Sequence, residues 1–410
     1  MLEKFLSYNS IVKESSDKIT SISYDVACYK EKNPYEKIVN GTIGVFLDED
    51  KKPSIPESIR NIYKNLDLDT IALYGFLFPT ENFQNGVFYL NNIDKRYQDN
   101  ISVFPTTGGL NALASFVHNF VNDQSLVFIF NPYWGPYENL FFEIGLKFNT
   151  IEMKSSSSFK IDKNYIFNQI NDKLNDKKIK NLIFLINFPA HNPTGTTFSD
   201  EELLSIQNDI SKFKSYGYEI LLVFDLVYLH FSFFDINKIF EIFKDFSFFF
   251  NFSLSKTLSL YGFRTGALCY YSKDVRDKEL FQTKLSFSAR ALTGSINHSG
   301  YKIVETIGKE FGLDEKRELI DHWNTIQQVM KKRWERVKNI LDKYGFQYYR
   351  HDEGFFVSFF HKDSNVEKLF TVFKENGLFF IPQKDSIRMA ISSMNIEDIE
   401  MLEKKIAKLF

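Results

Sequence analysis

The middle of the chain carries five polar side chains, each shortly after an apolar run. They are an amide at Asn192, a carboxylate at Asp225, a phenol at Tyr228, an amine at Lys256 and a guanidinium at Arg264. An amine kept away from water is a nucleophile for carbonyl carbons, and a guanidinium suits a phosphate dianion. Together these groups predict a site that holds a phosphorylated carbonyl compound through a covalent bond to lysine.

Each of these residues also has an ordinary structural interpretation. Most lysines are solvated surface charges, and Arg264 could form a salt bridge. Asp225 could cap a helix, and Asn192 could belong to a plain turn. Lys256, however, follows the strongly apolar run 248–252. Because α/β proteins place ligands at the carboxyl ends of such strands, the shared position favours a ligand site.

The order of these motifs from residue 40 to residue 388 resembles that of the aspartate and aromatic aminotransferases, which are fold type I pyridoxal phosphate enzymes. The resemblance implies that Lys256 forms the Schiff base with pyridoxal 5′-phosphate and then moves the substrate proton. It places Asp225 opposite the pyridine nitrogen, where a carboxylate keeps the ring protonated. It also implies that Tyr228 and Asn192 bind the phenolic oxygen of the ring and lower the pKa of the imine.

A glycine-rich segment before the helical pattern at 111–120 predicts a phosphate site, because a helix N-terminus offers free N–H groups. An ordinary turn is the alternative for this segment taken alone. The resemblance assigns the phosphate of the cofactor to Gly108, Gly109, Leu110, Ser253 and Arg264. Family members often carry a hydroxyl residue where this chain has Leu110, so one side-chain contact to the phosphate is either missing or supplied by Thr107.

Aromatic residues follow the apolar run at 126–130. The resemblance implies that Trp134 stacks on the cofactor ring, whereas core packing is its structural alternative. The segment that ends at Tyr137 departs from the commoner Pro-Asn-His, which leaves the partner group at this point open. His191, beside Asn192, is interpreted as structural rather than catalytic.

The resemblance implies a substrate site that two subunits share. Its expected members are Gly44, Trp134, Asn192, Arg290 and Arg388. Arg388 binds the α-carboxylate in this interpretation, and a buried salt bridge is the alternative. Arg290, otherwise a surface arginine, binds the distal carboxylate of a dicarboxylic substrate from across the dimer, and Tyr74 reaches the neighbouring subunit's cofactor phosphate. A homodimer is therefore expected.

These assignments predict an aminotransferase with a ping-pong mechanism. Aspartate or glutamate is the expected donor, with aromatic amino acids as a second class, and 2-oxoglutarate or oxaloacetate is the expected acceptor. A pyridoxal phosphate lyase or decarboxylase of the same fold is the alternative enzyme, since it would share Lys256, Asp225, Tyr228 and Asn192. A cofactor-binding regulatory domain without turnover is disfavoured, because no strongly basic patch or DNA-binding segment is evident.

Composition agrees with an enzyme for small molecules. The 410 residues include 50 basic and 52 acidic residues, and the net charge of −2 favours neither nucleic acid nor an acidic membrane. Cys28 and Cys269 are too few for a disulfide framework, which fits a reducing compartment. Residues 1–5 lack a signal-peptide pattern, and no apolar stretch approaches the roughly 18 residues of a membrane span. We therefore expect a cytoplasmic protein and no metal site.

Strand-length apolar runs mostly alternate with helical patterns, which predicts an α/β architecture. The runs are at 126–130, 182–188, 220–224, 248–252 and 267–271. Ser199 and Glu202 form a capping-box pattern, and the apolar residues after them predict a helix that ends before Gly217. We expect a large three-layer α/β/α domain of fold type I, with a mostly parallel sheet, at residues 49–322.

The C-terminal part predicts a smaller α+β domain. A long amphipathic helix over 323–341 is expected to cross between the domains. The expected strands and helix of the small domain are at 354–360, 387–391 and 366–375. In the resembled family the N-terminal segment folds back on this unit, so residues 1–48 are expected to join 323–410 in a discontinuous domain.

Overall fold

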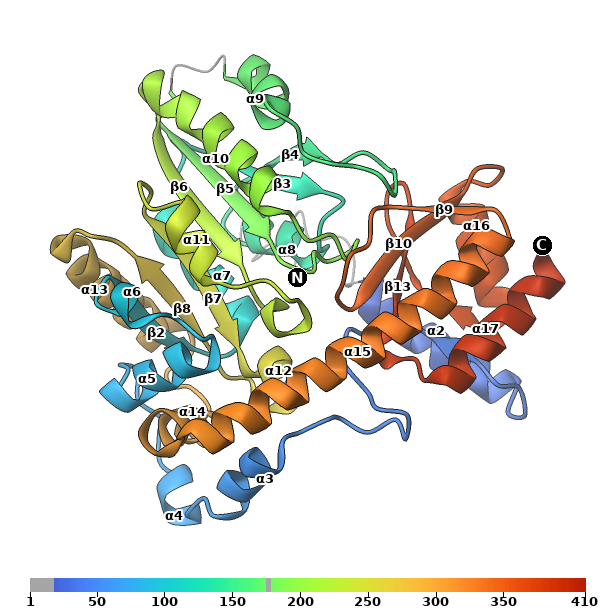
Figure 1. Cartoon of the computed structure of the whole chain (residues 1–410), viewed down its shortest axis with the longest axis horizontal. Coiled ribbons are helices and arrows are strands. Elements are labelled where there is room, and N and C mark those ends of the chain that lie inside the picture. Colours follow the sequence, from blue (N-terminus) through green and yellow to red (C-terminus); the bar gives the residue numbers. More distant parts are fainter. Residues whose placement is uncertain (1–17, 175–177) are drawn as a thin grey trace, which may run out of the picture.

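The computed structural model describes residues 18–174 and 178–410, and within these residues the large domain contains a seven-stranded sheet between helices (Figure 1). The strands are β2 (Ile101–Thr106), β3 (Ser125–Asn131), β4 (Asn149–Glu152), β5 (Asn181–Asn187), β6 (Glu219–Asp225), β7 (Phe248–Ser253) and β8 (Gly266–Tyr271). Their order is β2-β8-β7-β6-β5-β3-β4. β8 runs antiparallel to β2 and β7, and the other neighbouring pairs are parallel, as expected for a mostly parallel sheet.

Helices cover both faces of this sheet, which confirms the predicted three layers. One face packs against α3 (Glu57–Lys64), α5 (Glu81–Leu90), α9 (Tyr165–Ile170), α10 (Asp200–Ser215), α11 (Asn237–Ile242) and α14 (His298–Glu310). The other face packs against α7 (Gly109–Phe120), α8 (Pro136–Phe142) and α13 (Val275–Leu292). In the part of the chain that the structure describes, no helix is both long and apolar enough to cross a membrane.

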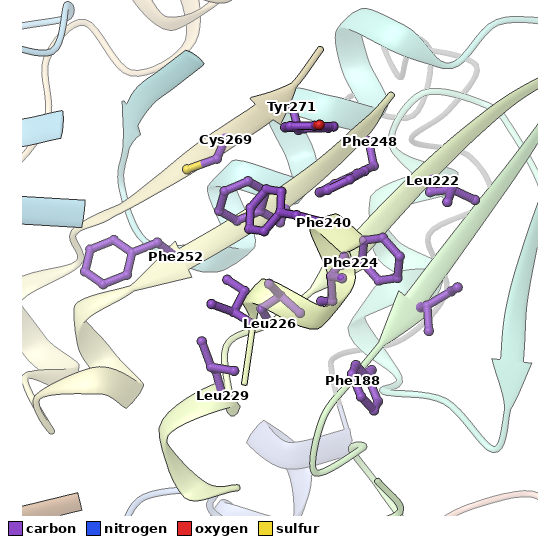
Figure 2. Close-up of a cluster of buried hydrophobic side chains, with 14 of the residues drawn as sticks. Phe188, Leu222, Phe224, Leu226, Leu229, Phe240, Phe248, Phe252, Cys269 and Tyr271 are labelled. Carbon is purple, nitrogen blue, oxygen red and sulfur yellow. The ribbon is translucent and has the colours of Figure 1, made fainter. Parts of the chain in front are cut away.

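The phenylalanine runs alternate between the two faces of the sheet. Phe248, Phe250 and Phe252 pack in the cluster on one face, whereas Phe249 packs in the cluster on the other. Successive side chains of a strand point to opposite faces, so a sheet covered on both sides buries every residue of such a run. Figure 2 shows Phe248 and Phe252 in one of these clusters, together with Cys269. The apolar runs therefore form buried strands, as predicted.

Local sequence signals located α10 but missed two strands. The Ser199 hydroxyl accepts a hydrogen bond from the backbone N–H of Glu202, and the Glu202 carboxylate accepts one from the N–H of Ser199, so the predicted capping box is present. The sequence pattern did not predict β2 or β4. Ser102 and Pro105 interrupt the apolar run of β2, and β4 has only four residues at the edge of the sheet.

The small domain is built from both ends of the described chain. Its elements are α2 (Lys18–Lys32), β1 (Val39–Asn40), β9 (Phe346–Tyr348), β10 (Phe356–His361), α16 (Val366–Glu375), β11 (Leu378–Phe379), β12 (Ile381–Pro382), β13 (Ile387–Ala390) and α17 (Ile396–Leu409). β1 pairs in parallel with β11, and Ile22 and Val26 of α2 pack against Phe379 and Ile381. The N-terminal segment thus folds back on the C-terminal unit. Residues 1–17 of the predicted small domain lie outside the described residues.

One long helix, α15 (Leu313–Lys343), connects the two domains (Figure 1). Trp323 packs in the large-domain cluster, and Ile326 packs in the small-domain cluster. The helix begins ten residues before the predicted start, because the segment before Trp323 is helical although its pattern is less apolar. The division of the chain at residues 322 and 323 stays a prediction.

Candidate active site

The residues expected to do chemistry meet around one cavity of about 300 Å³. Those that line it are Gly44, Gly109, Leu110, Trp134, Asn192, Asp225, Tyr228, Ser253, Lys256, Arg264 and Arg388. They come from the N-terminal segment, the edge of the large-domain sheet and the small domain. The fold therefore gathers side chains that lie up to 344 positions apart in the sequence.

The parallel strands explain why these groups share one edge. β5 and β6 end at Asn187 and Asp225, which are direct partners in the sheet register. β7 ends at Ser253, and the short helix α12 (Leu254–Thr257) places Lys256 just beyond that end. The carboxyl ends of parallel strands face the same side, so each strand delivers its next polar residue to the same cavity.

Lys256 is held away from bulk water at this edge. Its Nζ donates a hydrogen bond to the backbone carbonyl of Gly44. Burial, aided by the positive charges of Arg388 and Arg264, lowers the pKa of the Lys256 amine to about 7. A large fraction of the amine is therefore neutral near pH 7, and a neutral amine is the nucleophilic form.

Asp225 is buried, and two side chains hydrogen-bond its carboxylate. The Tyr137 hydroxyl donates to Oδ2 at 2.5 Å, and the Asn251 amide donates to Oδ1 at 2.8 Å. Burial raises the pKa of Asp225, and these two hydrogen bonds act in the opposite direction. Sequence reasoning missed Asn251, although an amide inside the run of phenylalanines in β7 was a signal that a buried polar partner exists.

Tyr228, Asn192 and Arg388 form a linked group across the domain boundary. The Asn192 amide nitrogen lies 3.4 Å from the Tyr228 hydroxyl, and Nη1 of Arg388 donates to Oδ1 of Asn192 at 3.3 Å. Nη2 of Arg388 donates to the carbonyl of Thr42 at 2.9 Å, and its guanidinium lies over the Phe356 ring. Burial raises the pKa of Tyr228, so the phenol stays protonated near neutral pH. A guanidinium thus lies at the cavity wall, fixed by oxygen acceptors and an aromatic face.

The start of α7 forms a narrow cradle. Gly108 has a φ of +92°, and a Cβ there would lie 2.9 Å from Nη2 of Arg264. A Cβ on Gly109 would lie 2.9 Å from Cγ1 of Val227 and 3.2 Å from Cβ of Ser253. A side chain at Gly108 would be strained by the positive φ and would push against Arg264, and one at Gly109 would push against Val227 and Ser253. The backbone at the start of α7, the Ser253 hydroxyl and the Arg264 guanidinium therefore come close together at this end of the cavity. Such a set of donors suits a phosphate group.

Three residues near this cradle differ in the hydrogen-bonding groups that they offer. Ser255 also lines the cavity, and its hydroxyl accepts a hydrogen bond from Nη1 of Arg264 at 3.2 Å, although sequence reasoning did not single it out. Leu110 is 40% exposed at the cavity wall and brings no hydrogen-bonding group. The backbone N–H of Thr107 is bound to the Asn111 side chain at 3.1 Å.

Trp134 and His191 have different surroundings. Trp134 lines the cavity, and its indole meets the Tyr137 ring edge-on, with centroids 5.4 Å apart. His191 is buried outside the set of lining residues, and its Nδ1 is 2.9 Å from the Thr194 hydroxyl. Burial lowers the pKa of His191 to about 3, so the imidazole is neutral over the physiological range.

Tyr74 and Arg290 do not line the cavity of the single chain. Tyr74 is 91% exposed, and Arg290 is exposed at the end of α13, where Nη1 is 3.4 Å from the carbonyl of Gly294. Other large apolar side chains near them in sequence, including Leu73 and Phe287, are also exposed. Their predicted roles in a neighbouring subunit stay predictions.

The fold and the cavity define a class of protein, and residues 36–406 match the model of the family described as aminotransferase class I and II. The chain belongs to this family. Enzymes of the family use pyridoxal 5′-phosphate. The resemblance inferred from the motifs is therefore confirmed at the level of the family and its cofactor.

Individual members of the family share only a low sequence identity with this chain. The cytoplasmic aspartate aminotransferase of Schizosaccharomyces pombe is 26% identical over 270 residues, which cover 62% of this chain and 63% of the yeast enzyme. The chain thus spans less than two thirds of that relative in the match. The corresponding enzyme of Saccharomyces cerevisiae is 24% identical over 73% of this chain and 72% of its own length.

Solved structures share the fold over almost the whole length. An aminotransferase from Anaerococcus prevotii has a TM-score of 0.83 at 23% identity and covers 98% of each chain. An aromatic amino acid aminotransferase from Burkholderia cenocepacia has a TM-score of 0.77 at 19% identity, over 97% of this chain and 98% of that one. At these identities the likeness establishes the fold.

Proposed function

We propose that this protein is a pyridoxal phosphate-dependent aminotransferase that moves an amino group from an L-amino acid to a 2-oxo acid by a ping-pong mechanism. The observation that carries the proposal is that Lys256, with a pKa lowered to about 7, shares one cavity with Asp225, Arg264 and Arg388. This set combines a nucleophilic amine, a buried carboxylate and two guanidiniums, which matches the chemical groups of the cofactor and of an amino acid.

The residues present fit pyridoxal phosphate at both ends. The cradle of Gly108 and Gly109 has no room for a Cβ and faces Ser253 and Arg264, as a phosphate requires. The buried carboxylate of Asp225 keeps hydrogen-bonding capacity for a protonated ring nitrogen. When bound, pyridoxal phosphate supplies an aromatic ring that accepts electrons from the substrate carbon.

In this proposal Lys256 has two roles, both at its Nζ. The neutral amine would hold pyridoxal phosphate through a covalent bond, and once the substrate amine had replaced it there, the freed amine would accept and return the proton of the substrate carbon. The carbonyl of Gly44 holds this nitrogen through a hydrogen bond. A Cβ on Gly44 would lie too close to the Phe356 ring, so a side chain at this position would displace the ring on which the Arg388 guanidinium lies.

Arg388 orients the substrate. Its guanidinium lies 4% exposed at the cavity wall and can form two parallel hydrogen bonds to the α-carboxylate, replacing its contacts to Asn192 and Thr42. A carboxylate fixed in this way directs the neighbouring C–H bond to the Lys256 amine. Tyr228 and Asn192, which line the same cavity, would donate to the phenolic oxygen of the cofactor.

We propose aspartate or glutamate as the preferred donor and 2-oxoglutarate or oxaloacetate as the acceptor, with aromatic amino acids as a second class of donor. The names of the two yeast relatives support the dicarboxylic class, and the name of the Burkholderia enzyme supports the aromatic class. Arg290 would supply the second positive charge from the partner subunit of a homodimer, where Tyr74 would reach the cofactor phosphate. A cytoplasmic location is part of the same proposal, in line with the names of the yeast relatives.

The test is steady-state turnover of L-aspartate with 2-oxoglutarate, measured as oxaloacetate and glutamate. We expect equal amounts of both products and parallel lines in double-reciprocal plots, which is the pattern of a ping-pong reaction. A lyase or decarboxylase of the same fold would consume aspartate without 2-oxoglutarate and release ammonia or carbon dioxide. That result would reject the aminotransferase and leave the cofactor assignment intact.

A further inference from the structure

Tyr137 joins two predicted cofactor-binding residues from a position that the sequence left open. It lies in the first turn of α8 and is 1% exposed. Its hydroxyl donates to Oδ2 of Asp225 at 2.5 Å, and its ring meets the edge of the Trp134 indole at an interplanar angle of 87°. The backbone N–H of Tyr137 also donates to the carbonyl of Trp134 at 3.0 Å. The position of the Tyr137 phenol is therefore fixed by the backbone hydrogen bond to Trp134 and by the hydrogen bond to the Asp225 carboxylate.

The direction of the hydrogen bond between Tyr137 and Asp225 is set by chemistry. Burial raises the pKa of Tyr137, and the nearby Asp225 carboxylate raises it further, so the phenol keeps its proton. An ionised carboxylate can only accept hydrogen bonds. The titratable groups that face Asp225 besides Tyr137 are Tyr228 and Lys256. The side-chain amides of Asn251 and Asn187 and the backbone N–H of Val227 also act on the carboxylate as donors.

We propose that Tyr137 is a positioning residue that holds the Asp225 carboxylate as a hydrogen-bond acceptor, in the orientation that the ring nitrogen of the cofactor needs. This inference rests on the proposed cofactor site. A histidine at this point could gain or lose a proton in the physiological range, whereas the phenol stays a donor throughout. In this chain the hydrogen bond from the residue on α8 to Asp225 would therefore be the same across the physiological pH range.

A substitution can distinguish the contribution of the Tyr137 hydroxyl from that of its ring. The Tyr137 ring belongs to the buried cluster on its face of the sheet, so a phenylalanine would fill the same space. Y137F removes the Tyr137 donor to Asp225, whose hydrogen bond lowers the pKa of the carboxyl group, so the buried carboxylate then takes up a proton more readily. A protonated Asp225 attracts a protonated ring nitrogen less strongly.

The experiment measures binding of pyridoxamine 5′-phosphate to the full chain without cofactor, by titration calorimetry from pH 6 to pH 9. This ligand forms no bond with Lys256, so the lysine amine is not consumed. We expect Y137F to bind about tenfold more weakly than wild type, the loss expected for one hydrogen bond to a charged group. The affinity of wild type divided by that of Y137F should grow as the pH falls, because the pKa of Asp225 is higher in the variant.

Y133F is the matched control. Tyr133 lies in the segment just before α8, and its hydroxyl donates to the Glu138 carboxylate rather than to Asp225. The Y133F variant should bind pyridoxamine 5′-phosphate as tightly as wild type does at every pH. Equal binding by Y137F and wild type at every pH would overturn the inference, whereas no binding by wild type would instead overturn the proposed cofactor site.

Y137H provides a second, independent readout. A histidine can donate to Asp225 but gains a positive charge as the pH falls, so its affinity relative to wild type should rise below the pKa of the imidazole. If the affinity of Y137H divided by that of wild type did not change from pH 6 to pH 9, the inference would be wrong. Circular dichroism checks that each variant is folded, and if Y137F is not, the Y137H profile decides.

Discussion

The two ends of the cavity differ in how completely one chain builds them. At the Asp225 end, Tyr137 and Asn251 already hydrogen-bond the carboxylate, and all three residues are buried. At the predicted side-chain end, Arg290 and Tyr74 are exposed and lie outside the cavity. The comparison teaches that the chemical groups are organised within one subunit, whereas the proposed choice of substrate depends on a second subunit.

The largest effect is expected from Lys256→Ala. It removes the amine whose pKa is lowered to about 7, so turnover should fall by at least about a thousandfold. Borohydride should attach the cofactor to wild type and not to the variant. Lys316→Ala is the control, because burial also lowers the pKa of Lys316, to about 8, but its Nζ donates to the Tyr89 carbonyl, away from the cavity. Cofactor trapped on the Lys256 variant would contradict the assignment.

The second largest effect is expected at the end of the cavity that would bind the substrate side chain, where Arg290 would come from a second subunit. Arg290→Leu should lower kcat/KM for aspartate by roughly ten- to a hundredfold, because a charge-assisted contact to the distal carboxylate is lost. The value for phenylalanine should change much less. Wild type should sediment as a dimer. Equal losses for both substrates, or full activity in a monomer, would show that Arg290 does not act across a subunit boundary.

A smaller effect is expected from pH on capture of the cofactor. The rate of covalent attachment of pyridoxal phosphate to the cofactor-free chain should rise roughly tenfold from pH 6 to pH 8 and then level off, since the pKa of Lys256 is about 7. The sign follows from the reactive form, which is the deprotonated amine. A rate that keeps rising tenfold per unit above pH 8 would show that the lysine has the pKa of a solvated side chain.

The smallest effect is expected at the phosphate cradle. Leu110→Thr adds a hydroxyl in the first turn of α7, where Leu110 offers none, so pyridoxal phosphate should bind about fivefold more tightly. Leu110→Ala is the matched control, because it shortens the side chain without adding a donor. Unchanged affinity in the threonine variant would indicate that the phosphate lies out of reach of this position.

Some features were predictable because their physical causes are local. The capping box at Ser199, the helix over 366–375 and the apolar runs of the strands depend on neighbouring residues or on a short period, so the sequence pattern located them. β2 and β4 were missed because their own patterns are mixed or short. β2 pairs over its six residues with β8, and that pairing joins segments far apart in the chain.

The order of residues along the chain places polar groups directly after the buried strands, and this order indicates the chemical class of the site. The partners of these groups depend on the folded structure. The Tyr137 hydroxyl reaches Asp225 across 88 residues, and the carbonyl of Gly44 reaches Lys256 across 212 residues. Strand order and domain packing set such contacts, and neither leaves a local periodic signal. The roles of a tyrosine in the first turn of α8 and of a glycine near the N-terminus therefore became interpretable once the fold had placed them beside the Asp225 carboxylate and the Lys256 amine.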